Sequence, residues 1–218
     1  MDRMEGRMNL EGEFKGSEEN SHLGGCSIGG DAGTYYPHMW EGLINKFNIE
    51  SVLDVGCGAG WSVKFFKDRD CRVLGIEGLQ EAIDSSPVKD DVYRHDYEKD
   101  GPFKPIGNFD LCWSCEFVEH VQESSAPNFI ETFKSAKFLA MTFAGPGQGG
   151  HHHVNCQPHQ YWIDLLGSHG FRFDEEATEE LKSLARLDEE EWQKIGDPWH
   201  SCFHFVVRGL FFVNENQP

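Results

Sequence analysis

The sequence is short of basic residues and of long apolar runs. Its 218 residues hold 19 lysines and arginines against 37 aspartates and glutamates, a net charge of −18. Because clustered cations bind a phosphate backbone, this balance argues against a nucleic-acid partner. No apolar run approaches the roughly 20 residues that span a bilayer, and the N-terminus shows no signal-peptide core. We therefore expect a cytoplasmic protein that has neither a membrane nor a nucleic-acid partner.

The sequence also has no disulfide framework. Its seven cysteines are odd in number and scattered along the chain. Cys112 and Cys115 form one Cys-x-x-Cys pair, but no second pair completes a four-ligand zinc site. We interpret Cys112 as a small buried hydrophobe and Cys115 as a residue of a pocket wall, and we assign no metal site.

Length and pattern indicate one domain. Strand and helix patterns alternate along a chain that is long enough for a single α/β core. Residues 1–33 are rich in glycine and acids and poor in apolar residues, so we expect a flexible segment or a loose lid there. Residues 34–218 are then the folded domain, which opens with a helix over 36–47 whose entrance we expect to close over a ligand.

Residues 52–60, Val-Leu-Asp-Val-Gly-Cys-Gly-Ala-Gly, carry the strongest pattern in the chain. Residues 51–55 read as a buried parallel strand, and residues 61–67 as a helix whose N-terminus faces the turn between them. Glycines in that turn permit close approach of a ligand to the backbone. The pattern predicts a cradle for a nucleotide-containing cofactor.

The spacing of the glycines decides which cofactor. In a dinucleotide fingerprint, Gly-x-Gly-x-x-Gly, the last glycine would fall on Trp61, whose ring obstructs close packing of helix and strand. The pattern present, Asp-x-Gly-x-Gly-x-Gly, resembles motif I of the class I S-adenosylmethionine (SAM)-dependent methyltransferases, and the resemblance covers most of residues 35–213. It implies an α/β fold of Rossmann-like type, with a seven-stranded, mostly parallel sheet, an antiparallel last strand and helices on both faces. It also implies SAM as the cofactor.

Acids follow the next two predicted strands. Glu77 ends the strand at 71–76, about 20 residues after the glycine turn, where a ribose diol can donate two hydrogen bonds to it. By the resemblance, Asp96, after the strand at 91–94, accepts the adenine amino group. The alternative for both acids is a solvated carboxylate at the end of a strand.

The strand at 109–113 opens into Ser-Cys-Glu-Phe-Val-Glu-His-Val, residues 114–121, which resembles the segment that follows this strand in the family. By the resemblance, residues 114–116 lie along the methionine part of the cofactor, and Leu79 and Tyr97 sandwich the adenine. The cofactor-binding candidates are Tyr36, Asp54, Gly56, Cys57, Gly58, Gly60, Glu77, Gly78, Leu79, Asp96, Tyr97, Ser114, Cys115 and Glu116.

Histidines gather in a glycine-rich loop at 144–155, after a predicted strand at 138–143. Because open α/β sheets bind ligands at the carboxyl ends of parallel strands, we expect this loop to face the substrate. One histidine of the loop is then a general base, or His151 and His153 bind a divalent metal with a nearby carboxylate, or the histidines only hold the loop by hydrogen bonds. For His120, a structural role and a catalytic role both stay open.

Together these features predict methyl transfer from SAM to a small molecule, with the hydroxyl of a metabolite or sugar as the acceptor. The catalytic candidates are His120, His151, His152 and His153. Two alternatives stay open: N-methylation of a small amine, which needs no firm base, and a SAM-binding module without turnover.

The C-terminal third is predicted from periodicity alone. A helix at 158–168 is followed by a short strand at 171–173. Thr178 and Asp188 each fit an N-cap, which predicts two acidic helices in succession. The apolar run at 201–213 indicates a long strand, which by the resemblance is the last strand of the family and runs antiparallel to the others.

Overall fold

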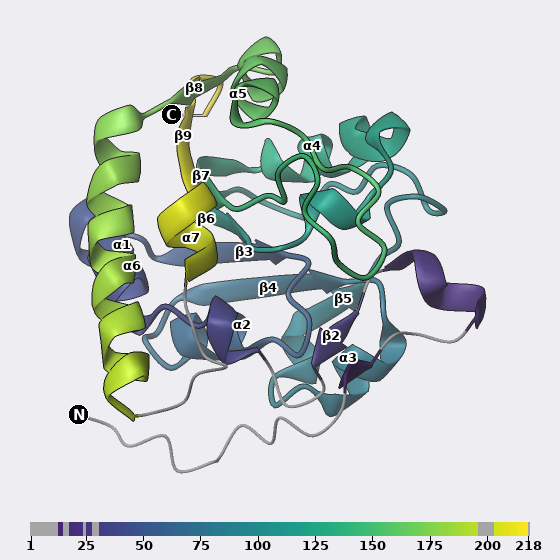
Figure 1. The fold of residues 1–218 in the computed structure, drawn as a ribbon, viewed down its shortest axis with the longest axis horizontal. Coiled ribbons are helices and arrows are strands. Elements are labelled where there is room, and N and C mark those ends of the chain that lie inside the picture. Colours follow the sequence, from purple (N-terminus) through teal and green to yellow (C-terminus); the bar gives the residue numbers. More distant parts are fainter. Residues whose placement is uncertain (1–12, 15–17, 24, 28–30, 196–202, 218) are drawn as a thin grey trace.

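One twisted sheet with helices on both faces forms the body of the protein (Figure 1). The computed structural model describes residues 13–14, 18–23, 25–27, 31–195 and 203–217. The sheet has the strand order β5-β4-β3-β6-β7-β9-β8. Its strands are β3 (Ser51–Val55), β4 (Arg72–Glu77), β5 (Val92–Arg94), β6 (Phe109–Ser114), β7 (Ala136–Met141), β8 (Phe171–Phe173) and β9 (Leu210–Asn214).

The pairing of the strands confirms the predicted fold class. Strands β3 to β7 pair in parallel, whereas β9 runs antiparallel to both β7 and β8. A separate antiparallel pair, β1 (Glu13–Phe14) with β2 (Cys26–Ser27), lies in the N-terminal segment. The chain order of the strands reverses between β3 and β6, and the carboxyl ends of strands at such a switch point are where this kind of sheet binds ligands.

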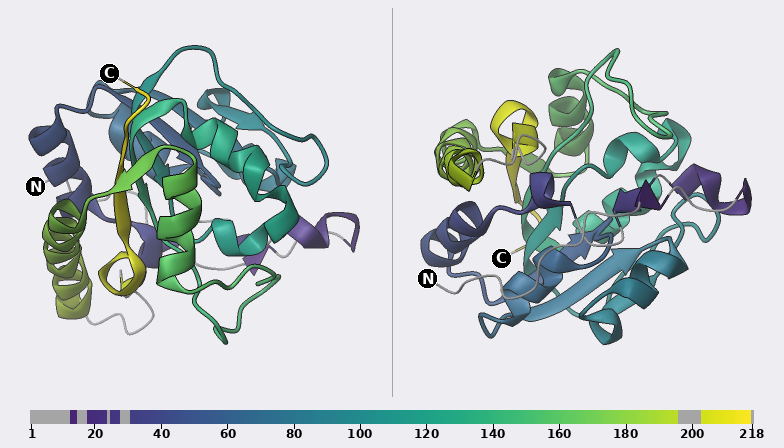
Figure 2. Two further views of the ribbon diagram at one scale, coloured as in Figure 1. Left: turned by 90° about the horizontal axis from the view of Figure 1, so that it is seen from above. Right: turned by 60° about the horizontal axis from the view of Figure 1, so that its bottom comes forward.

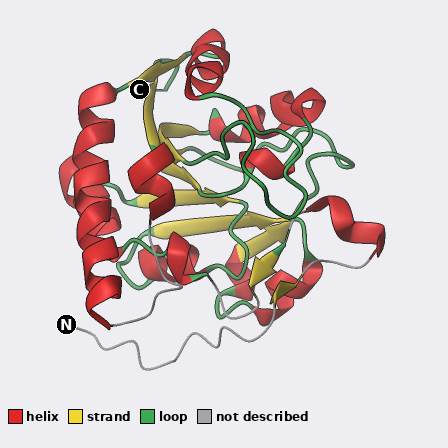
Figure 3. Ribbon diagram, viewed as in Figure 1, coloured by secondary structure: helices red, strands yellow, loops and turns green. Residues whose placement is uncertain are grey.

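Helices cover both faces of the sheet (Figures 2 and 3). The α-helices are α1 (Pro37–Phe47), α2 (Trp61–Lys67), α3 (Gln80–Ser85), α4 (Ala126–Phe133), α5 (His159–Ser168), α6 (Glu175–Ile195) and α7 (Phe203–Arg208). The 3-10 turns are η1 (Glu18–Leu23), η2 (Ala32–Thr34), η3 (Lys89–Asp91), η4 (Val118–His120) and η5 (Glu123–Ser125). No helix of the described residues has both the length and the apolar character of a membrane span.

The period of two along the strands divides the core into two halves. In β6, Leu111 and Trp113 pack with side chains of α1, α2, α6 and α7, whereas Cys112 packs on the other face with side chains of α4 and α5. All three residues are almost completely buried, so Cys112 is the small core residue that the sequence indicates. Because both faces are covered, the strands read as continuous apolar runs rather than as alternating ones.

The acidic region is one long helix, α6, and not the two predicted helices. Thr178 lies inside α6, where its hydroxyl donates to the Asp174 carbonyl (2.7 Å) and accepts from the Phe211 amide (3.0 Å). The second predicted cap, Asp188, is also inside the helix, and its carboxylate accepts from the His38 amide (2.9 Å) and the Met39 amide (3.2 Å). Asp188 therefore caps α1, which packs beside α6 in Figure 1.

The predicted strand at 201–213 was wrong in its first half. Residues 201–202 lie outside the described residues, Phe203–Arg208 form α7, and only Leu210–Asn214 pair as β9. Gly209 separates the two elements, and its amide donates to the Phe205 carbonyl (2.7 Å). Phe205 is fully buried with its ring centroid 5.7 Å from that of Trp113. An apolar run fits a buried helix and a buried strand equally well, so tertiary packing had to decide.

Candidate cofactor and acceptor site

The glycine turn leaves β3 through three residues with left-handed backbone. Gly56, Gly58 and Gly60 have φ values of 76°, 53° and 74°. The amides of Gly56 and Cys57 both donate to the Ile76 carbonyl on β4 (2.9 and 3.1 Å), which fixes the turn against the neighbouring strand. A Cβ on Gly56 would lie 2.5 Å from the Phe117 ring, so only glycine fits there.

Glu77 ends β4 beside this turn. Its carboxylate accepts hydrogen bonds from the amides of Gly58 and Leu79, each at 2.8 Å. Burial raises the pKa of the Glu77 carboxyl, and the backbone donors of Leu79, Gly58 and Gly78 oppose that rise. The carboxylate is thus held at the edge of the cradle, where the sequence places the ribose of the cofactor.

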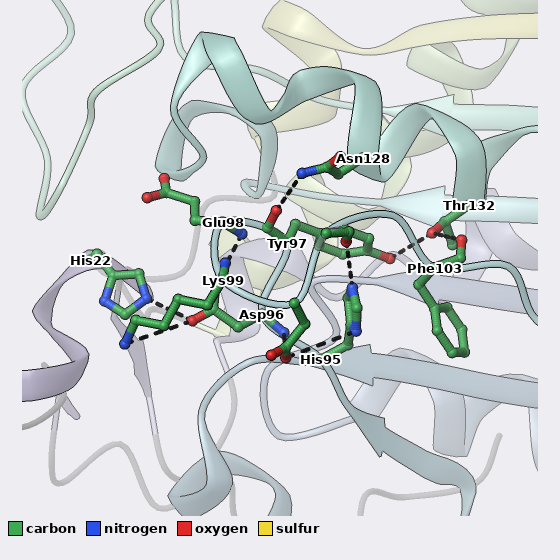
Figure 4. Close-up of polar contacts among 11 residues, drawn as sticks. His22, His95, Asp96, Tyr97, Glu98, Lys99, Phe103, Asn128 and Thr132 are labelled. Carbon is green, nitrogen blue, oxygen red and sulfur yellow. Dashed lines mark hydrogen bonds and ion pairs between the residues drawn. The ribbon is translucent and has the colours of Figure 1, made fainter.

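Asp96 follows β5 and is held by its own loop and by the N-terminal segment (Figure 4). It accepts from His22 Nε2 (2.7 Å) and from the amides of Glu98 (3.0 Å) and Lys99 (3.2 Å). Burial raises the pKa of the Asp96 carboxyl, but His22 and the backbone donors outweigh it, so the pKa lies below its usual range. His22 comes from η1, a segment in which the sequence indicates no site residue.

Tyr97, the residue after Asp96, is held by α4 instead of by the N-terminal segment. Its hydroxyl donates to Thr132 Oγ1 (2.9 Å), and its carbonyl accepts from Asn128 Nδ2 (2.7 Å), as Figure 4 shows. Burial raises the pKa of the Tyr97 phenol. Both partners lie on α4, so this helix sets the position of one wall of the site.

These residues surround a pocket with about 640 Å³ of atom-free space, its open mouth included. Eight of the predicted cofactor residues line it: Gly56, Gly58, Glu77, Gly78, Leu79, Asp96, Tyr97 and Glu116. The N-terminal segment adds His22, Leu23 and Gly25 to the lining, as a lid would; whether residues 1–33 are flexible stays a prediction.

Six predicted cofactor residues lie outside the lining: Tyr36, Asp54, Cys57, Gly60, Ser114 and Cys115. Tyr36 is fully buried, with its hydroxyl accepting from the Phe205 amide (3.1 Å) and its ring 5.8 Å from that of Trp113. It packs in the core instead of closing over the pocket, because α7 occupies the space beside it. Ser114 is fully buried as well and donates to the Val55 carbonyl (3.0 Å).

Asp54, the acid at the start of the glycine turn, also lies outside the pocket lining. It is 2% exposed and accepts a hydrogen bond from the Ser62 hydroxyl on α2. Burial raises its pKa to about 7, against the opposing effect of Ser62. Asp54 therefore fastens α2 to β3 below the cradle.

Glu116, which follows β6, also lines the pocket. Its backbone is left-handed, with a φ of 50°, and its carboxylate accepts from Thr142 Oγ1 (2.9 Å) and lies 3.1 Å from His204 Nδ1. Burial raises the pKa of the Glu116 carboxyl, but His204 and Thr142 bring it below its usual range. The sequence did not indicate His204, because it lies in the segment predicted to be a strand.

Of the four predicted catalytic histidines, His120 and His153 have rings that lie together, whereas the rings of His151 and His152 lie outside this pair. His120 lines the pocket, and its ring centroid is 5.0 Å from that of His153. Burial and the neighbouring His153 lower the pKa of His120 to about 4. His151 is exposed, and burial lowers the pKa of the partly buried His152. The loop thus sends His153 to the site, where Glu119 and His120 are its neighbours and the three offer the donor set of a metal ion.

Comparisons with known proteins agree with this geometry. Residues 53–135 match the family described as "Methyltransferase domain". The bovine 18S rRNA (guanine-N(7))-methyltransferase is 31% identical over 103 residues, which are 45% of this chain and 36% of the relative. The matched part therefore spans about a third of the length of that relative.

Solved structures show the same fold. A putative methyltransferase in complex with the Haloferax volcanii Trm112 methyltransferase activator is 17% identical, with a TM-score of 0.55 over 82% of this chain and 90% of the other. PKMT2 from Rickettsia typhi, in complex with AdoHcy, is 10% identical, with a TM-score of 0.55 over 86% of this chain and 54% of the other. Magnesium protoporphyrin IX methyltransferase from Synechocystis with bound SAH is 15% identical, with a TM-score of 0.51 over 65% and 77%.

The sheet order, the glycine turn and the two carboxylates define a class I methyltransferase fold. Residues 53–135 match a methyltransferase domain, and this match agrees with the predicted enzyme class and with SAM as the predicted cofactor. Glu77 and Asp96 fit that cofactor, since their buried carboxylates face the pocket from the ends of adjacent strands. SAM supplies an electrophilic methyl group on a sulfonium.

Proposed function

We propose that this chain transfers the methyl group of SAM to a hydroxyl oxygen of a small molecule, a metabolite or a sugar. The observation that carries the proposal is the imidazole of His120, which lines the same pocket as Glu77 and Asp96 and has His153 against it. A hydroxyl must lose its proton as its oxygen is methylated, whereas an unprotonated amine can attack without a base. Histidines at the acceptor end therefore favour oxygen over nitrogen.

The reaction needs alignment more than covalent help. The hydroxyl oxygen attacks the methyl carbon, an O–C bond forms as the S–C bond breaks, and sulfur keeps the electron pair and leaves as a neutral thioether. The hydroxyl proton passes to an unprotonated imidazole or to water. Holding the oxygen in line with the methyl carbon and sulfur can contribute up to about 7–11 kcal/mol. With its pKa lowered to about 4, His120 is unprotonated at neutral pH.

Charge supports a small acceptor. Four acids line the pocket, namely Glu77, Asp96, Glu98 and Glu116, and its lining includes no lysine or arginine among the described residues. The whole chain carries a net charge of −18. A phosphate backbone would be repelled by this surface.

An RNA base is the second candidate acceptor, because the bovine relative is named as an rRNA methyltransferase. That likeness covers 45% of this chain, and residues 53–135, the part that matches the family, hold the glycine turn, Glu77 and Asp96. A likeness that covers less than half of this chain, and a fold shared with many methyltransferases, carry little information about the acceptor.

The test supplies the purified chain with methyl-labelled SAM and either a desalted metabolite extract or total RNA. We expect SAH to accumulate only with the metabolite extract, and NMR of the labelled product to place the methyl group on oxygen. The variant Glu77→Ala, which removes the ribose acceptor, should form product much more slowly at a SAM concentration that just saturates the wild type, and serves as the control. Methylated RNA or an N-methyl product would overturn the acceptor, and saturable SAM binding without any SAH would overturn the enzyme activity.

A further inference from the structure

Three side chains converge beside the pocket, and one of them, His120, lines it. Glu119 and His120, from η4, and His153, from the glycine-rich loop, each offer a ligand atom, and these atoms lie within 4.8 Å of one another. Among the described residues, no other three His, Cys, Asp or Glu side chains come together in this way. The sequence alone pairs His151 with His153, but His151 is exposed and His120 takes its place.

The backbone holds these residues together. The amides of Val154 and Asn155 both donate to the Glu119 carbonyl (2.9 and 3.1 Å), so the loop is attached to η4 directly beside the three side chains. Asn155 is 1% exposed, and its side-chain amide donates to the Val118 carbonyl (3.4 Å). The residue before His153, His152, has a left-handed φ of 52°, which turns the chain into the site.

Glu119 is the second, independent observation. Its side chain is completely buried, and no group of the described residues meets hydrogen-bond geometry at either of its carboxylate oxygens. His120 Nδ1 is buried and lacks a hydrogen-bond partner in the same sense. Glu116 repels a negative charge on Glu119, and Arg208 only partly offsets that repulsion. A buried carboxylate whose oxygens lack hydrogen-bond donors costs several kcal/mol, so a positively charged ligand bound directly to these oxygens would stabilise it.

His153 is held as metal-binding imidazoles are. Its Nδ1 is 3.3 Å from the Gln148 carbonyl, and a second hydrogen bond of this kind fixes the orientation and the tautomer of a ligating ring. A Cβ on Gly150 would lie 2.2 Å from His153 Nε2, so the absence of a side chain there leaves room for the ring.

We propose that Glu119, His120 and His153 bind one divalent transition-metal ion at the acceptor end of the pocket. Two imidazoles and one carboxylate favour Mn²⁺, Fe²⁺, Co²⁺ or Zn²⁺ over Mg²⁺ and Ca²⁺, which prefer oxygen ligands. Three protein ligands leave a coordination position for an exogenous oxygen. His120, one of the three ligands, lines the pocket, so the ion would lie beside a bound acceptor.

The role of the ion rests on the proposed methyl transfer to oxygen. A hydroxyl bound to a divalent ion has a lowered pKa, so it loses its proton to water before or during attack on the methyl carbon. In the metal-bound enzyme the lone pair of His120 is on the ion, so water takes the hydroxyl proton, and His120 favours methyl transfer to oxygen by holding the ion instead of by accepting the proton itself. Nothing is oxidised or reduced in this step.

The binding test needs no acceptor and therefore stands apart from the proposed function. Full-length protein is stripped of metal by chelation and titrated with Co²⁺, whose visible absorption reports nitrogen and oxygen ligands, and with Mn²⁺ followed by electron paramagnetic resonance. The variants are Glu119→Gln, nearly isosteric, and His153→Ala on the loop. His169→Ala, at the end of α5 and outside the cluster, is the matched control.

We expect one Co²⁺ per chain in the wild type and in His169→Ala, and binding at least about tenfold weaker in the two cluster variants, since even losing a supporting partner costs that much. SAH affinity should stay unchanged in both, which shows that they fold. Equal Co²⁺ binding by the wild type and the cluster variants, or none by the wild type, would overturn the site. Methyl transfer that persists in chelator would overturn the role of the ion and leave the proposed function standing. Tight Co²⁺ binding without any methyl transfer would overturn the proposed function and leave the metal site standing.

Discussion

Asp54 should make the stability of this protein depend on pH in a way that Asp54→Asn removes. Burial raises the pKa of its carboxyl from 3.8 to about 7. In the unfolded chain this carboxyl is ionised above about pH 4, whereas in the folded chain it keeps its proton up to about pH 7. Between those values the folded state binds the additional proton. Stability is therefore highest at low pH on this account and falls as the pH rises through that window.

The size of the effect follows from the two pKa values. One pKa unit is worth about 1.4 kcal/mol, so raising the pH from about 5 to about 8 should cost the wild type about 3 kcal/mol through Asp54. The Ser62 hydroxyl can still donate to the amide oxygen in Asp54→Asn, so the local contact survives. Taking the difference between the variant and the wild type cancels the titration of all other groups.

The assay is urea denaturation, without ligand, at several pH values between about 5 and 8. We expect the unfolding free energy of Asp54→Asn relative to the wild type to increase by about 3 kcal/mol across that range. Asp84→Asn, an exposed aspartate on α3, should show no such trend. A difference between Asp54→Asn and wild type that does not change with pH would mean that the buried carboxyl is ionised throughout, and the burial argument would be refuted.

Three further predictions concern the walls of the pocket. Glu77→Ala removes the acceptor of two amide donors and, as proposed, of the ribose diol, and should weaken SAH binding in calorimetry about ten- to a hundredfold; an unchanged affinity would contradict this. Thr132→Val leaves the Tyr97 hydroxyl buried without its acceptor and should cost about 1–3 kcal/mol in urea, whereas adding Tyr97→Phe should recover much of that loss. Gly56→Ala combines a φ of 76° with a Cβ 2.5 Å from the Phe117 ring, so it should abolish SAH binding and lower the melting temperature, with only part of the loss recovered by Phe117→Ala.

Local patterns were sufficient for most of the sheet and for the cofactor end of the pocket. β3, α2 and β8 have the predicted bounds, because short apolar runs flanked by glycines or by a helical period leave few alternatives. The predicted strand at 138–143 was two residues too late, since β7 is Ala136–Met141. Glu77 and Asp96 line the pocket where the spacing from the glycine turn places them, since each follows directly on its strand.

Contacts between distant segments decided the rest. Thr178 and Asp188 have the residue types of helix caps, but their actual partners are on β9 and α1, and no local rule reveals that. Tyr36 lies in the core because α7, some 170 residues later in the sequence, packs against it. His204, which anchors Glu116, and His22, which anchors Asp96, had no signal in the sequence, since each acts across a long separation in the chain.

The sequence by itself was sufficient to predict the class of fold and the cofactor. The glycine turn with Trp61 after it, the two acids and the alternation of strands and helices exclude a dinucleotide and indicate SAM, because they are local features of one βαβ unit. Only the tertiary structure decided which histidines meet. His120 and His153 are 33 positions apart, and they come together with the unpartnered carboxylate of Glu119 because two backbone hydrogen bonds attach the loop to η4. The cofactor end of the pocket is thus predictable from the spacing of residues along the chain, whereas the proposed acceptor end depends on contacts between segments that are distant in the sequence.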